Sequence, residues 1–375
     1  MALGLWRHPE DHSHDFIDVD HSVRLEKLLE APLAVVSAMV AAMKSIGIGV
    51  TLSTTYESPS HLARRLSTAG HLFKGSYPDS AARNMGFKKQ LEDDERYAQA
   101  EEYVKLVYKL LESPWRDDSV VADLKRGVYT EPDRVRAINH EGKLFNVRGP
   151  HICQPSPQRT TLILQAGTSR SGTLLGAQHA EAIFLSSYAP HVCAINIAEI
   201  WELASSDFGR DGRNVKFLAL ATPIREKTEG KAKAKLTEYR KYASLEGALA
   251  LFCGWTGIDL SEYGDDEELR HVESNAAIAE HVSIGWNGLV FVGTGVQVAD
   301  AFQTWVFEAD VDGFNLAYAL FPQSFKDIDD LLLPDLRSRE NFYAKKGQKV
   351  PLDEHIASRY PWKAGIDAKG HIIPE

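Results

Sequence analysis

Residues Thr160 to Gly172, TTLILQAGTSRSG, decide the fold of this chain. The uninterrupted apolar run at Thr160 to Gln165 predicts a buried strand. A turn rich in small residues then joins this strand to a helix that ends near His179. The next apolar run, Ala182 to Leu185, predicts a second strand. A buried strand, a helix and another strand in this order indicate a βα unit of a parallel sheet.

The same alternation of strands and helices extends along the rest of the chain. Apolar and β-branched runs predict further strands at residues 46–55, 215–221 and 313–320. Apolar residues at helical spacing predict helices at residues 31–46, 62–73, 101–111 and 296–309. The stretch AINHEGKLFNV at 137–147 predicts a hairpin that turns at Glu141-Gly142. Together these elements indicate an α/β protein.

A charged, helix-prone insertion separates the last two of these predicted strands. It covers residues 227–287 and contains the basic stretch KAKAKLTEYRK and the acidic stretch GDDEE. Such an insertion is typical of a lid or a subunit-contact arm, and a solvated excursion is an equal alternative.

Composition excludes several classes of protein. The chain has 375 residues, of which 44% are hydrophobic and 25% charged, which fits one large barrel or two medium domains. Its net charge of -10 argues against nucleic-acid binding. The longest apolar stretch, Ala31 to Met43, is too short for the roughly 20 residues that span a bilayer, so we expect no membrane association. Three widely spaced cysteines without a signal peptide predict buried, inert thiols and a cytoplasmic location.

The turn QAGTSRSG, Gln165 to Gly172, is the strongest candidate for ligand binding. Its small residues let backbone N–H groups approach an anion, its hydroxyl side chains are further donors, and the helix that follows presents its positive end. The spacing of Gly167 and Gly172 mimics a nucleotide P-loop, but Thr and Leu occupy the next two positions, where Lys and Ser or Thr are required. From the residues alone, a phosphate loop and an ordinary strand-to-helix turn are equal alternatives.

Other motifs are weaker. Four histidines near the start of the chain, interleaved with carboxylates, do not have the spacing of a recognised metal site, so we assign no metal. Gly293-Thr-Gly295 lacks a third glycine and is not predicted to open a complete βαβ unit, which argues against a Rossmann fingerprint. Acidic residues at Asp93 to Glu95 predict the start of a helix.

Several longer motifs occur along the chain: GLWRHPEDHS (4–13), GVTLSTTYESP (49–59), DSAARNMG (79–86), DERYAQAEEYVKLVYKLLES (94–113), FNVRGP (145–150), QAGTSRSG (165–172), FVGTGVQVAD (291–300) and DGFNL (312–316). Their order resembles one family, the bacterial-luciferase-like flavin monooxygenases, in the branch of nitrilotriacetate and dibenzothiophene-sulfone monooxygenases. The resemblance runs from Gly4 to about Phe342.

The resemblance implies a TIM (β/α)8 barrel with its active site at the carboxyl ends of the strands. It implies one luciferase-like domain over residues 1–345, including the insertion at 227–287, followed by a C-terminal tail at 346–375. It also implies a monooxygenase that uses reduced FMN, supplied by a separate NAD(P)H:flavin reductase, to oxidise a small organic substrate with O2. We expect a homo-oligomer.

The resemblance also assigns residues to FMN, at the positions that match the family's motifs. Gly167 and Ser169 are the expected contacts to the flavin phosphate. Tyr97, Thr51 and, with less support, Ser53 are the other expected FMN contacts, and no catalytic residue is assigned.

Departures from the family pattern predict an incomplete barrel. Family members have a strand before GLWRHP, a second one between the positions that match Leu29 and Ala31, and a strand with the pattern GWNxVTS between those that match Gly75 and Ser76. The first, second and fourth barrel strands are therefore missing or replaced, and Asp93 stands where relatives have histidine. Two alternatives follow: a flavin-incompetent or truncated relative acting as a non-catalytic protein, and a deazaflavin-dependent oxidoreductase on the same barrel.

Overall fold

The computed structural model describes residues 49–66, 70–74, 82–83, 86–156, 159–167, 169–256, 275–285 and 288–339. The predicted helix at 31–46, the histidine-rich start, the positions where the first two barrel strands are predicted to be missing or replaced, and the tail at 346–375 lie outside these ranges. The chain divides into two compact units, which are described separately. The β7 unit comprises residues 32–75, 91–181 and 351–375, and the β9 unit comprises residues 1–31, 76–90 and 182–350.

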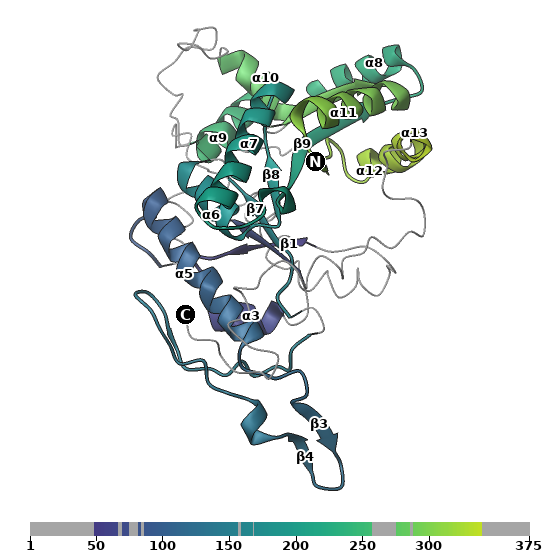
Figure 1. The fold of residues 1–375 in the computed structure, drawn as a ribbon. Helices are drawn as coiled ribbons and strands as arrows, with labels where there is room; N and C mark the ends of the chain where they lie inside the picture. Colours follow the sequence, from purple (N-terminus) through teal and green to yellow (C-terminus); the bar gives the residue numbers. More distant parts are fainter. Residues whose placement is uncertain are drawn as a thin grey trace. The chain divides into compact units, whose positions relative to one another are not determined.

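The described residues of the β7 unit form three parallel strands in the order β1 (Gly49–Ser53), β2 (Gly70–Lys74) and β7 (Ile163–Ala166). Its helices are α3 (Pro59–Leu66), α5 (Asp93–Glu112) and α6 (Arg170–His179), labelled in Figure 1. One face of α5 packs with α3 and β7 in a core of Leu62, Ala63, Tyr103, Val104, Leu106, Val107, Tyr108, Leu110, Leu111 and Ile163. Apolar residues at helical spacing therefore bury this face, as the sequence predicts.

Strand β2 corrects one expectation and bears on a second. The predicted helix at 62–73 is wrong beyond Leu66, because Gly70–Lys74 is a strand that pairs with β1 on one side and β7 on the other. Pairing along both edges overrides the local helical pattern. Residues 70–74 therefore provide a strand next to β1, where the family comparison predicted that one was missing or replaced. Within the described residues, β1 is hydrogen-bonded along one edge only.

The described residues of the β7 unit also form two short hairpins and a 3-10 turn. Strands β5 (His140–Glu141) and β6 (Asn146–Val147) form the hairpin predicted at 137–147. The other hairpin, β3 (Val120–Asp123) with β4 (Val128–Thr130), was not predicted, and the turn η1 covers Pro132–Arg134.

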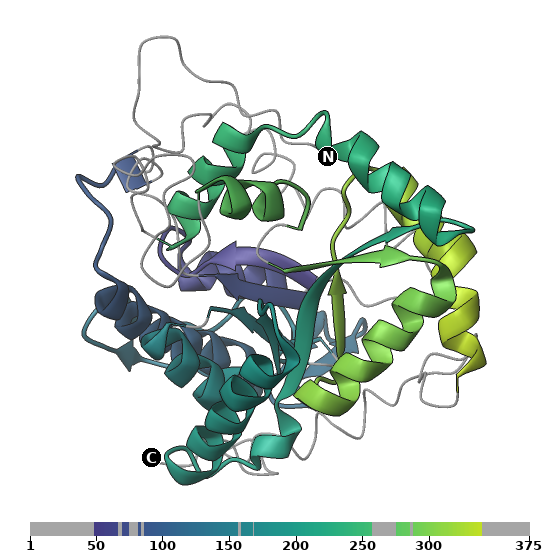
Figure 2. The ribbon, with the colours of Figure 1, turned by 90° about the horizontal axis from the view of Figure 1, so that it is seen from above.

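The β9 unit is built around its longest strand. Strand β9 (Lys216–Arg225) pairs in parallel with β8 (Ala182–Leu185), β11 (Gly313–Leu316) and β10 (Leu289–Gly293), using residues 216–219, 218–221 and 221–225 respectively. In Figure 2, β9 is the long teal strand that runs beside the green strands. Its helical elements are α7 (Pro190–Ser206), η2 (Gly212–Asn214), α8 (Glu229–Arg240), α9 (Leu245–Thr256), α10 (Asn275–Gly285), α11 (Gly295–Ala309), α12 (Gln323–Asp327), the π-helical turn η3 (Ile328–Leu332) and α13 (Leu333–Ser338).

Most predictions for this unit are confirmed. The strands predicted at 182–185, 215–221 and 313–320 correspond to β8, β9 and β11, and the described residues of the insertion at 227–287 include helices α8, α9 and α10. Strand β10 and helix α7 were not predicted. Gly293 and Gly295 do lie in a βαβ connection, β10–α11–β11, which corrects the expectation for that motif. Thr294 begins α11 with a capping box.

Two further expectations concern membranes and thiols. Among the described residues, no helix combines the length and the apolar character that crossing a bilayer requires. Cys193 is buried, and burial raises the pKa of its thiol to about 11, as expected for an inert cysteine. Cys153 and Cys253 are only half-buried, so the prediction of burial is wrong for these two.

Candidate functional site

The loop between β7 and α6 is shaped to hold an anion. Gly167 has a φ of +152°, a conformation that other residues rarely adopt. Ser169 is the N-cap of α6: it is exposed, and its Oγ accepts a hydrogen bond from the N–H of Gly172 at 3.2 Å. The first turn of a helix also presents N–H groups that have no partner within the helix. Several donors and the positive end of α6 therefore meet at this loop.

Tyr97 lies against the two glycines of this loop. A Cβ atom placed on Gly167 would lie 2.8 Å from the Tyr97 Oη, and one on Gly172 would lie 2.6 Å from the same atom. Both distances are below normal contact, so the tyrosine hydroxyl occupies the space that two side chains would otherwise need. The structure thus brings together Tyr97, Gly167 and Ser169, three residues that the family resemblance assigns to FMN.

Thr51 and Ser53 belong to the neighbouring part of the same sheet. Both are backbone members of β1, which is separated from β7 by β2 alone. The carboxyl ends of parallel strands share one edge of a sheet, so Ser53, the last residue of β1, lies at the edge from which the loop after β7 begins.

Gln165 is a residue of this region that the sequence did not single out. Its side chain is 4% exposed, and its Nε2 donates a hydrogen bond to the carbonyl of Gly167 at 3.3 Å. Its Oε1 is buried and has no hydrogen-bond partner among the described residues. The available signal was its position, directly before the loop in the motif QAGTSRSG.

The start of α5 adds negative charge beside the loop. Helix α5 begins at Asp93, which confirms the predicted helix start. The carboxylate of Asp94 accepts a hydrogen bond from the Ser171 Oγ at 2.5 Å. This contact places an exposed carboxylate next to the first turn of α6, where it reduces the attraction for an anion.

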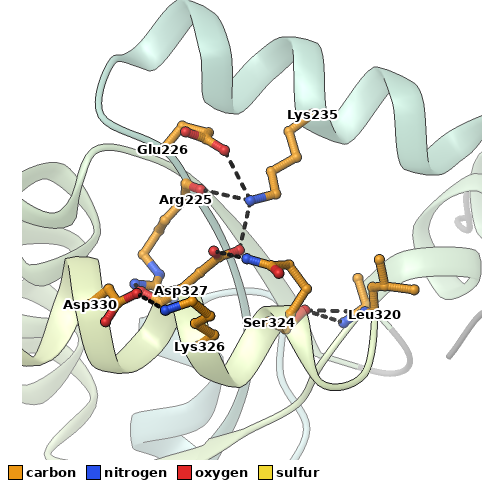
Figure 3. Close-up of polar contacts among 10 residues, drawn as sticks. Arg225, Glu226, Lys235, Leu320, Ser324, Lys326, Asp327 and Asp330 are labelled. Atoms are coloured by element: carbon orange, nitrogen blue, oxygen red, sulfur yellow. Dashed lines mark hydrogen bonds and ion pairs between the residues drawn. The ribbon is translucent and has the colours of Figure 1, made fainter.

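A second polar cluster, at the end of β9, has a different character (Figure 3). The Lys235 Nζ contacts the Asp327 Oδ2 at 2.6 Å, the Glu226 Oε1 at 3.1 Å and the carbonyl of Arg225 at 3.3 Å. Gln323 donates to the other oxygen of Asp327 at 2.8 Å. These contacts of Lys235 and Gln323 join β9, α8 and α12.

Arg225 is the most deeply buried member of the β9 cluster. It is fully buried, and its Nη1 donates to the carbonyl of Asp327 at 2.5 Å. Its Nε and Nη2 have no hydrogen-bond partner within the described part of the chain. Burial lowers its pKa to about 10, although the nearby Asp327 acts in the opposite direction. Burial also acts to lower the pKa of Lys235, but hydrogen bonds to Asp327 and Glu226 outweigh it and raise that pKa.

The described residues do not meet the requirements of a metal site. In the ranges that the structure describes, no three His, Cys, Asp or Glu side chains are grouped closely enough to hold a metal ion. The histidines of the first 21 residues lie outside those ranges.

Comparisons with known proteins relate the chain to monooxygenases. The long-chain alkane monooxygenase of Geobacillus thermodenitrificans (strain NG80-2) is 37% identical over 419 aligned positions, covering 96% of this chain and 94% of that protein. The dimethyl-sulfide monooxygenase of Hyphomicrobium sulfonivorans is 41% identical, covering 82% of this chain and 70% of that protein. Since 419 positions exceed the 375 residues of this chain, the first alignment includes positions at which this chain has no residue.

Solved structures of similar proteins have the same fold as this chain. The crystal structure of the long-chain alkane monooxygenase LadA has a TM-score of 0.80 at 38% identity, covering 88% of this chain and 78% of that one. The riboflavin lyase RcaE, solved with a modified FMN and riboflavin, has a TM-score of 0.78 at 28% identity, covering 87% of this chain and 78% of that one. Residues 7–312 match the model of the luciferase-like monooxygenase family. The chain therefore belongs to the luciferase-like monooxygenases, a family of reduced-flavin-dependent enzymes that work with separate reductases.

Proposed function

We propose that this protein is a monooxygenase that uses reduced FMN and O2 to oxidise a small organic substrate, with the flavin supplied by a separate NAD(P)H:flavin reductase. The observation that carries this proposal is the arrangement of Tyr97, Gly167 and Ser169 around the start of α6. The relatives named above act on a long-chain alkane and on dimethyl sulfide, and this supports an organic substrate.

The loop residues fit the phosphate of FMN. The N–H groups of the first turn of α6 are available as donors to an anion. The Ser169 Oγ accepts from Gly172, which leaves its hydroxyl proton able to donate to a phosphate oxygen. In this proposal Tyr97, Thr51 and Ser53 contact other parts of FMN.

In this proposal FMN and the residues of the chain have different roles. When bound, reduced FMN supplies the electrons that activate O2. The residues of the chain hold the phosphate, orient the flavin and limit the access of water to it. The proposal assigns no catalytic residue.

The variant Ser169→Ala tests the proposal through binding. A hydrogen bond to a charged phosphate contributes about 1.5–3 kcal/mol, so we expect Ser169→Ala to bind FMN about 10- to 100-fold more weakly. Riboflavin, which lacks the phosphate, should bind the variant and the parent equally. Both affinities can be measured by quenching of flavin fluorescence.

The control for this test is Thr228→Ala. Thr228 caps α8 as Ser169 caps α6, accepting from the N–H of Lys231 at 3.4 Å, so each variant should lose about 1 kcal/mol of helix stability. Only Ser169→Ala should also lose FMN affinity. Equal FMN binding by Ser169→Ala and the parent would reject the assignment of the loop.

A second candidate function is that of a flavin-incompetent relative. It is favoured by the alignment of 419 positions, which shows that this chain lacks residues that the alkane monooxygenase has. Titration of the parent protein separates the two candidates. A protein that unfolds cooperatively but binds neither FMN nor riboflavin would support the flavin-incompetent relative and reject the monooxygenase.

A further inference from the structure

Strand β9 carries a buried hydroxyl group for which the described fold provides no partner. Thr222 is fully buried, and its Oγ1 has no hydrogen-bond partner among the described residues. A buried hydroxyl without a partner destabilises a folded protein, and valine has nearly the same shape without that cost. The stability of the fold alone therefore does not explain threonine at this position.

The side chain of Thr222 points away from helix α11. Its neighbour Ala221 packs with Val298 and Phe302 of α11. Successive side chains of a strand point to opposite faces of the sheet, so Thr222 belongs to the face of β9 that α11 does not cover. We call this face of β9, and of the strands paired with it, the inner face.

The inner face is mostly apolar around Thr222, and it is only partly covered. Leu220 lies two residues before Thr222 on β9, and Val290 of β10 is the partner of Thr222 in the parallel ladder, so both share its face. Asn315 of β11, the partner of Leu220, adds an amide group. Leu220, Val290 and Asn315 are each half-buried. An apolar surface with a few polar groups is typical of a site for a small molecule.

The position of Thr222 along its strand agrees with such a site. It lies in the carboxyl-terminal half of β9, and proteins with parallel sheets bind their ligands at the carboxyl ends of the strands. A ligand that supplies an acceptor would satisfy the hydroxyl proton, whereas a plain hydrocarbon would leave it unsatisfied. Because Leu220, Val290 and Asn315 carry no charge, the inner face disfavours an ionised ligand.

We propose that the inner face binds the organic substrate, and that Thr222 favours substrates with an uncharged hydrogen-bond acceptor, such as an ether oxygen, a carbonyl oxygen or a sulfide sulfur, over plain hydrocarbons. The proposal rests on the proposed function, because it names the class of organic substrate for that reaction. Thr222 acts by binding the substrate, and no step of the oxidation is assigned to it.

The test is the variant Thr222→Val, studied in the full-length protein with FMN present. The probes are diethyl ether and n-pentane, which have the same chain length and differ in one oxygen atom. Relative to the parent, Thr222→Val should bind diethyl ether about fivefold more weakly, as for one hydrogen bond between uncharged groups, and n-pentane with less than about a twofold change. Both affinities can be measured by isothermal titration calorimetry.

The melting temperature without a ligand provides a second readout. Thr222→Val removes an unsatisfied hydroxyl, so its melting temperature should equal or exceed that of the parent. The control is Thr304→Val on α11, which removes the hydrogen bond from the Thr304 Oγ1 to the carbonyl of Asp300 at 3.1 Å. The control should bind both probes as the parent does.

Three outcomes would overturn the proposal: a Thr222→Val variant that keeps the parental ratio of the two affinities, a melting temperature of this variant below that of the parent, or the same selective loss in Thr304→Val. Failure of the proposed function has a different signature, because the parent would then bind no FMN in a fluorescence titration. A parent that binds FMN, combined with a parental ratio in Thr222→Val, would reject the role of Thr222 alone.

The variants Thr222→Ser and Thr222→Ala keep the proposal testable if Thr222→Val does not fold. Both remove the methyl group of threonine, and they differ from each other in the hydroxyl alone. Thr222→Ser should retain the parental ratio of diethyl ether to n-pentane affinity, and Thr222→Ala should lower it about fivefold. Equal ratios in these two variants would reject the proposal.

Discussion

Two polar clusters, each at the carboxyl end of a parallel strand, use their polar groups in opposite ways. The first cluster is the loop that joins β7 to α6, here called the anion loop. Its Ser169 is exposed, and the first turn of α6 presents its N–H groups. In the β9 cluster, Lys235 contacts two carboxylates, and Asp327 is 9% exposed. The loop has donors to offer to a ligand, whereas in the β9 cluster the Lys235 ammonium group is directed at the carboxylates of Asp327 and Glu226.

We expect this difference to separate a ligand-binding loop from a cluster that stabilises the fold. Breaking a buried ion pair leaves an uncompensated charge and destabilises the fold, whereas an exposed donor contributes little until a ligand arrives. Changes in the β9 cluster should therefore alter the free energy of unfolding, and changes in the anion loop should alter FMN affinity. Three variants test this contrast, in order of decreasing effect on stability.

Lys235→Met should have the largest effect on stability. It leaves Asp327 and Glu226 without their cation, and because the side chains of Lys235 and Asp327 are only 15% and 12% exposed, we expect a loss of about 3 kcal/mol. The free energy of unfolding can be measured by urea denaturation, and FMN affinity should not change. The control, Lys233→Met, removes an exposed pair with Glu229 on the same helix and should cost less than about 0.5 kcal/mol. Similar losses in the free energy of unfolding of the two variants would contradict the stabilising role assigned to the β9 cluster.

Glu102→Gln should have an intermediate effect that depends on pH. The Glu102 carboxylate accepts the N–H groups of Phe145 at 2.8 Å and Leu144 at 3.0 Å and lies 3.6 Å from the His140 Nε2. Burial acts to raise its pKa, but these backbone hydrogen bonds and His140 outweigh it and lower the pKa. We expect a loss of about 1–2 kcal/mol near pH 7.

The sign of this pH dependence follows from the lowered pKa. Because the pKa of Glu102 is lower in the folded than in the unfolded state, its contribution is complete above the unfolded value of about 4.3 and is lost as the pH falls through the folded value. Denaturation curves of parent and Glu102→Gln should therefore converge in acid. Glu102 and Tyr97 both belong to α5. If Glu102→Gln binds FMN as the parent does, a change elsewhere on α5 does not by itself alter FMN binding at the loop. A difference in stability that persists at low pH would contradict the role assigned to the ionised carboxylate.

Gly172→Ala should have the smallest effect on stability and a clear effect on binding. Replacing glycine in a helix normally stabilises it by about 0.5–1 kcal/mol, but here the new Cβ would lie 2.6 Å from the Tyr97 Oη and 3.2 Å from the Gly167 carbonyl. We expect this displacement to cancel the gain in stability and to weaken FMN binding about tenfold, as for the loss of one hydrogen bond to a charged group. The control is Gly230→Ala in α8, where no described atom lies within 4 Å and the full gain should appear. A stabilised Gly172→Ala with parental FMN affinity would reject the contact with Tyr97.

The parts of the fold that the sequence predicted correctly are those with a strong local pattern. Strands β7 and β8 are apolar runs, because strands in a covered parallel sheet are buried on both faces. Strand β2, GHLFK, has no such run, and it is a strand because it pairs with β1 and β7. Pairing between distant segments leaves little trace in a five-residue stretch.

In the candidate site, too, the sequence predicts residues within a local motif but not contacts between distant segments. Gly167 and Ser169 stand in a motif whose small and hydroxyl residues indicate an anion loop. Tyr97 was assigned by family resemblance, since its closeness to the loop depends on how α5 packs. Gln165 was overlooked because a buried glutamine carries no periodic signal, and its unsatisfied oxygen appears only in three dimensions.

The length of β9 has a consequence for how its unit comes apart. Because residues 216–225 are hydrogen-bonded in succession to β8, β11 and β10, β9 cannot detach without breaking all three ladders. Any one of β8, β10 and β11, by contrast, can separate from β9 while the ladders between β9 and the other two strands persist. The unit should therefore lose its sheet stepwise from its outer strands, with β9 retaining the slowest-exchanging amides until global unfolding.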